Sequence, residues 1–301
     1  MKDSTTGVLR VSDKVRRIEI GTRRLSSEAF HGGVQSRFRG RGMDFDEVRE
    51  YEPGDDVRAI DWNASARSGR TFVKKYREER QLTVVFVVDM SASGSLGAGP
   101  SSKREQGVEI AGTLAISALR SDHRVGLVLF TDAVETFIPP ARGRAHTLRI
   151  VRDMVAFEPK GRGTHLALAL RTVRERIQRR SVIVVLSDFL LGQSAMDAAR
   201  LEFRALGARH DVVAIRLGDT GDRELPDVGL LTLEDVETGE VVEVDTGSAA
   251  LRAKLDVATR EAEARVRTML RGSEVSLLDV DTLRPYLAAL VGFFRTRGRR
   301  T

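Results

Sequence analysis

Four short apolar runs constrain the fold of this chain more than any other feature of its sequence. β-Branched residues dominate these runs, which are Leu82–Val88, Val125–Phe130, Val182–Ser187 and Val212–Leu217. Continuous apolar runs of this length are typical of parallel strands that are buried on both faces. Segments with helical character lie between or beside them, namely Lys103–Leu119, Ala145–Phe157, Leu166–Arg179 and Ala195–Leu206. This alternation predicts an α/β fold with a doubly wound, mostly parallel sheet.

The segments outside this alternation predict additions to the sheet. Leu230–Val244 favours a β-hairpin that turns at Glu237–Glu240, and a helix, a strand and a last helix are expected after it. Residues 32–70 have few periodic apolar positions and predict a long loop. We expect an N-terminal region (residues 1–80) packed on a core (residues 81–220), and a C-terminal hairpin with helices (residues 221–301) that completes the same domain.

Polar side chains follow the predicted strands where each strand ends. Asp89, Ser91 and Ser93 come after the first run, and Asp188 follows the third. Thr164 ends a Gly-Arg-Gly-Thr loop ahead of a predicted helix. In a doubly wound sheet the carboxyl ends of the strands meet at one edge, where ligands bind. All five side chains offer hard oxygen ligands, which suit Mg²⁺ or Mn²⁺ better than zinc or copper.

The Asp-x-Ser-x-Ser spacing has a physical reason. Alternate residues of an extended segment point the same way, so Asp89, Ser91 and Ser93 can face one cation. Two neutral hydroxyls leave the charge of the ion only partly balanced, which favours an anionic ligand from outside the chain. A plainer interpretation remains open, in which Asp89 and Ser91 only cap the following helix.

The same residues resemble a known site. The triplet Asp89, Ser91 and Ser93, together with Thr164 and Asp188, is similar to the metal-ion-dependent adhesion site of von Willebrand factor A domains. A longer stretch resembles the signature of the DUF58 family, which covers the chain from about Gly33 to its C-terminus. The segments that carry this second resemblance are Arg49–Trp62, Ser65–Arg67, Val73–Arg80 and the turn Glu237–Glu240.

The resemblance implies a fold, a metal and a partner. Members of the family carry a von Willebrand A core and tend to be encoded with MoxR-type AAA+ ATPases, with which they are thought to act as adaptors in remodelling or maturing a client. In such sites the hydroxyls contact Mg²⁺ directly or through water, the aspartates anchor its water shell, and an acidic residue of the partner completes the coordination. All five positions match here.

An enzymatic function is the main alternative. Asp89 at the end of a buried strand is also the position of the nucleophile in aspartyl-phosphate hydrolases, so the alternative hypothesis is a Mg-dependent hydrolase or phosphatase that uses Asp89. Those enzymes resemble one another in an Asp-x-Asp motif, whereas Ser91 stands at its second position here. The sequence also lacks a phosphate-binding Gly-x-x-x-x-Gly-Lys-Ser/Thr loop and a Gly-x-Ser-x-Gly elbow. We therefore expect a protein that is not an enzyme.

Composition and charge limit where the protein is expected to act and what it is expected to bind. The chain has no cysteine, and its N-terminus has no apolar signal-peptide core, so we expect a cytoplasmic protein. No apolar run approaches the roughly 20 residues of a membrane helix, so no transmembrane segment is expected. The net charge of +6 is compatible with nucleic acid, an anionic membrane surface or an acidic partner, but a solvated arginine-rich surface is the simpler interpretation. No zinc finger, RNA-binding aromatic motif or helix-turn-helix stands out. Specific nucleic-acid binding is therefore not expected.

Overall fold

The computed structural model describes residues 15, 18, 44–52, 55, 60–77, 81–97, 101–219 and 226–299. The chain divides into two compact units. Residues Phe38–Gln81 form the smaller unit, and Met1–Arg37 together with Leu82–Thr301 form the larger one. None of the helices in the described part of the chain is long and apolar enough to cross a membrane.

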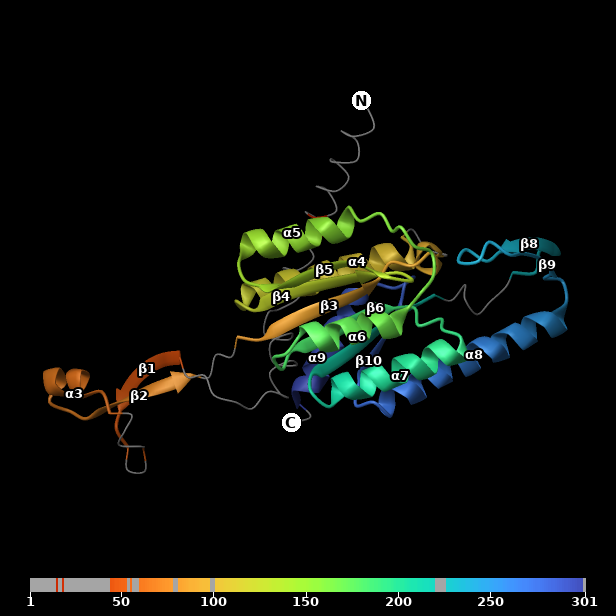
Figure 1. Ribbon diagram of the computed structural model, residues 1–301. Helices are drawn as coiled ribbons and strands as arrows, with labels where there is room; N and C mark the ends of the chain where they lie inside the picture. Colours follow the sequence, from red (N-terminus) through yellow and green to blue (C-terminus); the bar gives the residue numbers. More distant parts are fainter. Residues whose placement is uncertain are drawn as a thin grey trace. The chain divides into compact units, whose positions relative to one another are not determined.

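A six-stranded sheet forms the centre of the larger unit (Figure 1). Its strands, in spatial order, are β10 (Ser276–Asp281), β7 (Asp211–Gly218), β6 (Val182–Ser187), β3 (Thr83–Asp89), β4 (Arg124–Phe130) and β5 (Val134–Ala141). Only the edge pair β4 and β5 is antiparallel. The chain order of the strands reverses between β3 and β6, which makes this gap the topological switch point of the sheet.

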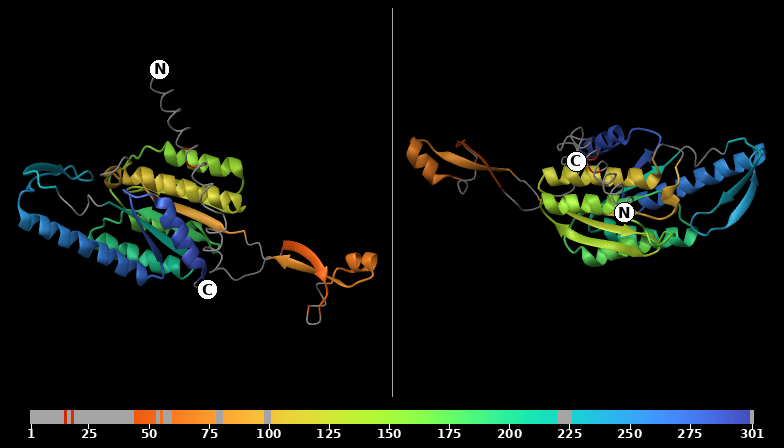
Figure 2. Two further views of the ribbon diagram at one scale, coloured as in Figure 1. Left: turned by 180° about the vertical axis from the view of Figure 1, so that it is seen from behind. Right: turned by 90° about the horizontal axis from the view of Figure 1, so that it is seen from above.

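Helices cover both faces of the sheet (Figures 1 and 2). They are α4 (Lys103–Arg120), α5 (Arg144–Val155), α6 (Leu166–Arg176), α7 (Gln193–Gly207), α8 (Ala249–Arg271) and α9 (Tyr286–Arg299). One core joins the sheet to α6, α7 and α8 through residues such as Val87, Val185, Leu170, Phe203 and Leu270. On the other face α4 contacts β3, β4 and α5. The strands are therefore buried on both sides, as their unbroken apolar runs predict.

A two-stranded hairpin follows β7 along the chain. β8 (Leu230–Glu234) and β9 (Val241–Asp245) pair antiparallel, so the predicted hairpin is confirmed. Its base is tied by Thr246, a fully buried residue whose Oγ1 donates to the carbonyl of Gly229 at 2.7 Å and accepts from the amide of Val228 at 3.1 Å. The strands themselves are largely exposed. The hairpin is thus held at its base and projects from there.

The smaller unit corrects the expectation of a long loop over residues 32–70. Its described part contains β1 (Asp44–Glu50), α3 (Trp62–Ser68) and β2 (Phe72–Arg77), with β1 and β2 paired antiparallel. The register shifts between Phe45 and Glu47, and this bulge removes the two-residue alternation that marks a strand. Residues 32–43, 53, 54 and 56–59 of the predicted loop lie outside the described residues. The packing of residues 1–80 on the core stays a prediction.

Candidate metal centre

Strand β3 carries Asp89 to the switch point of the sheet. Beyond it the chain turns, and the amide of Ser91 donates to Asp89 Oδ1 at 3.0 Å. The hydroxyls of Ser91 and Ser93 lie 3.1 Å apart. A short 3₁₀ turn, η2 (Ser93–Ser95), begins at the second serine. The three residues of the Asp-x-Ser-x-Ser motif are therefore neighbours in space as well as in sequence.

Strand β6 brings a second carboxylate to the same place. The hydroxyl of Ser187 donates to Asp89 Oδ2 at 2.7 Å, and Asp188 follows directly. The amide of Phe189 donates back to Ser187 Oγ at 3.0 Å, and Leu190 donates its amide to Asp188 Oδ1 at 3.1 Å. Phe189 has φ +56°, a backbone conformation that bulky residues rarely adopt. Such strain is common at functional sites, where the surrounding structure holds it in place.

The loop that bears Thr164 is fixed by a carboxylate from β5. Glu135 accepts the hydroxyl of Thr131 at 2.6 Å and the amides of Lys160 and Gly161 at 2.9 and 3.0 Å. Burial acts to raise the pKa of Glu135, but these hydrogen bonds outweigh it and lower this pKa. A backbone bond from Ala92 to the carbonyl of Arg162, at 2.9 Å, joins this loop to the segment of Ser91 and Ser93.

Electrostatics distinguish Asp89 from an ordinary surface carboxylate. Burial raises the pKa of Asp89 from 3.8 to about 6, and the negative charge of Asp188 adds to the rise. Hydrogen bonds from Ser187 and Ser91 act against it. A cation between the two carboxylates would offset both burial and repulsion. Hard oxygen donors are what Mg²⁺ and Mn²⁺ require, so the donor set fits such an ion.

Hydroxyl ligands are necessary for any such site. In the part of the chain that the structure describes, no three histidine, aspartate or glutamate side chains gather closely enough to hold a metal ion. Two aspartates with Ser91, Ser93 and Thr164 are therefore the set that this edge of the sheet offers. The binding of Mg²⁺ or Mn²⁺ at this site stays a prediction.

The helix-capping interpretation of Asp89 and Ser91 is not what the structure contains. Helix α4 begins at Lys103, and its N-cap is Ser102. The hydroxyl of Ser102 accepts the amide of Glu105, whose carboxylate in turn accepts the amide of Ser102, both at 3.2 Å. This capping box satisfies the start of the helix without Asp89 or Ser91.

One functional contact escapes the sequence analysis. The hydroxyl of Thr164 donates to Glu237 Oε1 at 2.9 Å. Glu237 lies in the turn between β8 and β9, and sequence reasoning places it there only as part of a turn. The one sequence signal for Glu237 is its place in Glu237–Glu240, a turn that resembles the DUF58 signature. The hairpin therefore brings a carboxylate to the rim of the candidate site.

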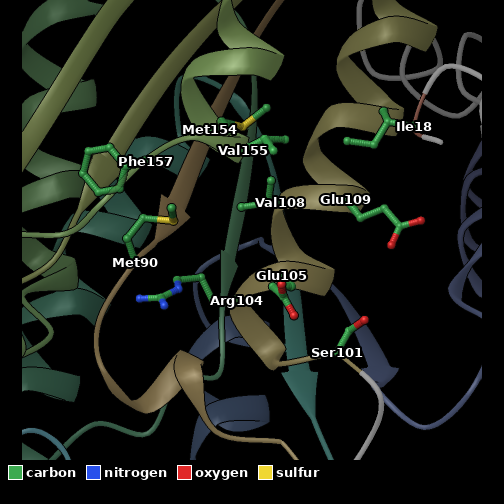
Figure 3. Close-up of a pocket in the computed structure, with 10 residues that line it drawn as sticks. All are labelled: Ile18, Met90, Ser101, Arg104, Glu105, Val108, Glu109, Met154, Val155 and Phe157. Carbon is green, nitrogen blue, oxygen red and sulfur yellow. The ribbon is translucent and has the colours of Figure 1, made fainter. Parts of the chain in front are cut away.

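A separate pocket lies between α4 and α5 (Figure 3). Met90, Val108, Met154 and Phe157 line it, and Ile18 from the N-terminal segment closes one side. Its polar lining comes from Ser101, Arg104, Glu105 and Glu109. None of the five candidate ligands contributes to this lining. The pocket is therefore not the candidate metal centre.

The chain matches a known protein family over most of its length. The family model described as "Protein of unknown function DUF58" matches residues 47–265. The uncharacterized proteins Mb1516 of Mycobacterium bovis and Rv1480 of Mycobacterium tuberculosis are each 34% identical to the chain over 287 residues. These alignments cover 95% of this chain and 89% of each relative.

Solved structures match the chain at low sequence identity. A von Willebrand factor type A protein from Catenulispora acidiphila is 10% identical, with a TM-score of 0.43, over 75% of this chain and 43% of that one. An aerotolerance-related membrane protein from Bacteroides fragilis is 15% identical, with a TM-score of 0.50, over 71% of this chain and 99% of that one. The strand order and the Bacteroides likeness bear out the expected fold class, a doubly wound, mostly parallel α/β sheet.

Proposed function

The chain belongs to the DUF58 family, and we propose that it is a non-enzymatic interaction protein that binds an acidic residue of a partner through a divalent cation. The observation that supports the proposal is the pair of buried aspartates, Asp89 and Asp188, at the switch point of the sheet, with Ser91 and Ser93 beside Asp89 and the loop of Thr164 joined to their segment. Open α/β sheets bind their ligands at this position.

Each residue has a role that follows from its contacts. Ser91, Ser93 and Thr164 would hold the ion through hydroxyl oxygens, and Asp89 and Asp188 would balance its charge. Ser187 orients Asp89 through its hydrogen bond to Oδ2. Mg²⁺, when bound, would supply a positive charge on which a partner's carboxylate can bind. Because Mg²⁺ holds its waters tightly, that binding should be reversible.

Metal binding can be tested on the chain alone. A thermal-shift titration with Mg²⁺ and Mn²⁺ should give a saturable rise in Tm, because a ligand that binds only the native state stabilises it by mass action. Asp89→Ala should abolish the metal-dependent rise. The matched control is Asp197→Ala, which removes an exposed carboxylate from α7 and should leave the rise intact. An equal rise in Asp89→Ala, or none in the wild type, would contradict the proposal.

A MoxR-type AAA+ ATPase is the partner that we propose, either directly or together with its client. The support for this choice is the resemblance of the signature segments and of the five site residues to those of the family. If the ion bridges the two proteins, an ATPase captured on the immobilised chain in Mg²⁺ should be released by EDTA. An ATPase that stays bound through EDTA washing would rule out the metal bridge.

Hydrolysis by Asp89 has less support. Both oxygens of its carboxylate already accept hydrogen bonds, Oδ1 from the amide of Ser91 and Oδ2 from the hydroxyl of Ser187. Ser91 also stands where an aspartyl-phosphate hydrolase needs a second carboxylate for acid–base catalysis. Mg²⁺-dependent hydrolysis of a phosphate ester that Asp89→Asn removes would overturn the non-enzymatic proposal.

A further inference from the structure

The tip of the β8–β9 hairpin touches the candidate metal centre. Glu237 Oε1 accepts the hydroxyl of Thr164 at 2.9 Å, across 73 residues of sequence. Figure 1 shows the hairpin beside the edge of the sheet at which the strands β3 and β6 end. A carboxylate of the chain itself thus lies against one of the five candidate ligands.

The turn is built to hold Glu237 in this position. Asp235 Oδ1 accepts the amides of Glu237 and Thr238 at 2.8 and 3.2 Å, and these bonds lower the pKa of Asp235. Gly239 has φ +76°, which favours glycine at this point of the turn. Side-chain bonds to the backbone of this kind fix a turn locally. The direction of Glu237 is therefore set by its own loop.

The rest of the hairpin is poorly supported by packing. The exposed fraction is 73% for Leu230, 58% for Val241 and 50% for Val242, whereas Glu237 at the tip is half-buried. A two-stranded hairpin is marginally stable by itself. The contact at Thr164 therefore holds an element that can move away at low cost once that contact is lost.

We propose that Glu237 is an internal acidic ligand of the metal centre, which occupies the place of the partner's carboxylate until a partner displaces it. This inference rests on the proposed function, since it needs a cation at Thr164. One oxygen of Glu237 faces Thr164, and a carboxylate has about four lone-pair sites, so its capacity to bind a cation is not used up. The hairpin then acts as a gate that makes binding competitive.

The charge of Glu237 separates this role from a structural one. Glu237→Gln keeps an oxygen that can accept the hydroxyl of Thr164 but removes the negative charge. Glu240→Gln is the matched control, because Glu240 is an exposed glutamate of the same turn. Isothermal titration of Mn²⁺ into the full chain should show affinity reduced about tenfold or more in Glu237→Gln, as when a supporting carboxylate of a metal site is removed. Glu240→Gln should match the wild type.

Two further measurements test the gate. Mn²⁺ should slow hydrogen exchange at the amides of residues 235–240 in the wild type and not in Glu237→Gln. Acetate, as a minimal carboxylate probe, should raise the Tm of Mn²⁺-loaded Glu237→Gln more than that of the Mn²⁺-loaded wild type.

The outcomes separate the two proposals. If the wild type binds Mn²⁺ through Asp89, and Glu237→Gln binds it equally well with unchanged exchange, Glu237 is only a brace and the inference fails while the proposed function stands. If the wild type binds no Mn²⁺, or Asp89→Ala binds it as well, both fail together.

Discussion

Gly161 shows how one residue without a side chain can position a loop of the candidate metal centre. Its amide donates to Glu135, and its Cα faces Thr131 and Asp132 so closely that an added Cβ would collide with Asp132 Oδ1 and Thr131 Oγ1. The loop can lie against β4 and β5 only because nothing projects at this position. Thr164 lies three residues later in the same loop, which a backbone bond joins to the segment of Ser91 and Ser93.

We therefore predict that Gly161→Ala displaces the loop. The collision should cost about 1–3 kcal/mol of unfolding free energy, as overpacking usually does, and it should weaken the Tm response to Mg²⁺. Urea unfolding and the metal thermal shift measure the two effects. Gly163→Ala is the control, since its added Cβ would meet only Asp132 Cβ at 3.7 Å, an ordinary contact. Equal behaviour of the two variants would show that the loop tolerates the change.

Among the elements, buried parallel strands could be predicted well from sequence. The run Val182–Ser187 coincides with β6, and Val125–Phe130 differs from β4 by one residue. Burial on both faces forces every position to be apolar, so the signal is local and strong. β1 was missed for the opposite reason. Among the described residues it pairs with β2 alone, five of its seven residues are charged, and its bulge breaks the alternation.

The residues of the candidate site also differ in how well the sequence predicts them. Asp89, Ser91, Ser93 and Asp188 follow strand ends directly, so the strand prediction places them at one edge of the sheet. Glu237 could not be found in this way. Its contact with Thr164 joins a hairpin tip to a loop 73 residues away, and no spacing rule relates two such elements. Such a contact depends on the direction in which the hairpin extends, so only the structure can reveal it.

At the scale of the whole molecule, the pH dependence of stability should report a histidine at the end of the sheet where β6 begins, opposite the end that carries Asp188. His210 is 2% exposed, and the amide of Ser181 donates to its Nδ1 at 3.2 Å. Such an acceptor must be unprotonated. Burial lowers the pKa of His210 from 6.5 to about 4, and the positive charges of Arg209 and Arg180 act in the same direction. As the pH falls, His210 therefore binds a proton in the unfolded chain before it does so in the native protein.

The sign of the effect follows from this difference. Between the unfolded pKa of 6.5 and the native value of about 4, the unfolded state binds more protons, so stability falls as the pH falls. Asp89 acts in the opposite sense, because its pKa is raised to about 6 in the native protein. Native Asp89 takes up a proton before the unfolded chain does, which adds stability as the pH falls. The pH profile of the wild type alone would therefore combine the contributions of His210 and Asp89.

Comparison with His210→Asn isolates the histidine, since the asparagine keeps an acceptor near the position of Nδ1 but does not titrate, and Asp89 is common to both proteins. Between about pH 7 and pH 5 the wild type should lose about 1 kcal/mol more unfolding free energy than His210→Asn, a value that allows for partial solvent screening. Urea unfolding in EDTA, which keeps metal binding out of the comparison, measures the difference. Parallel pH profiles for the two proteins would mean that the native fold accommodates a charged imidazole at β7, and burial would then not control this histidine.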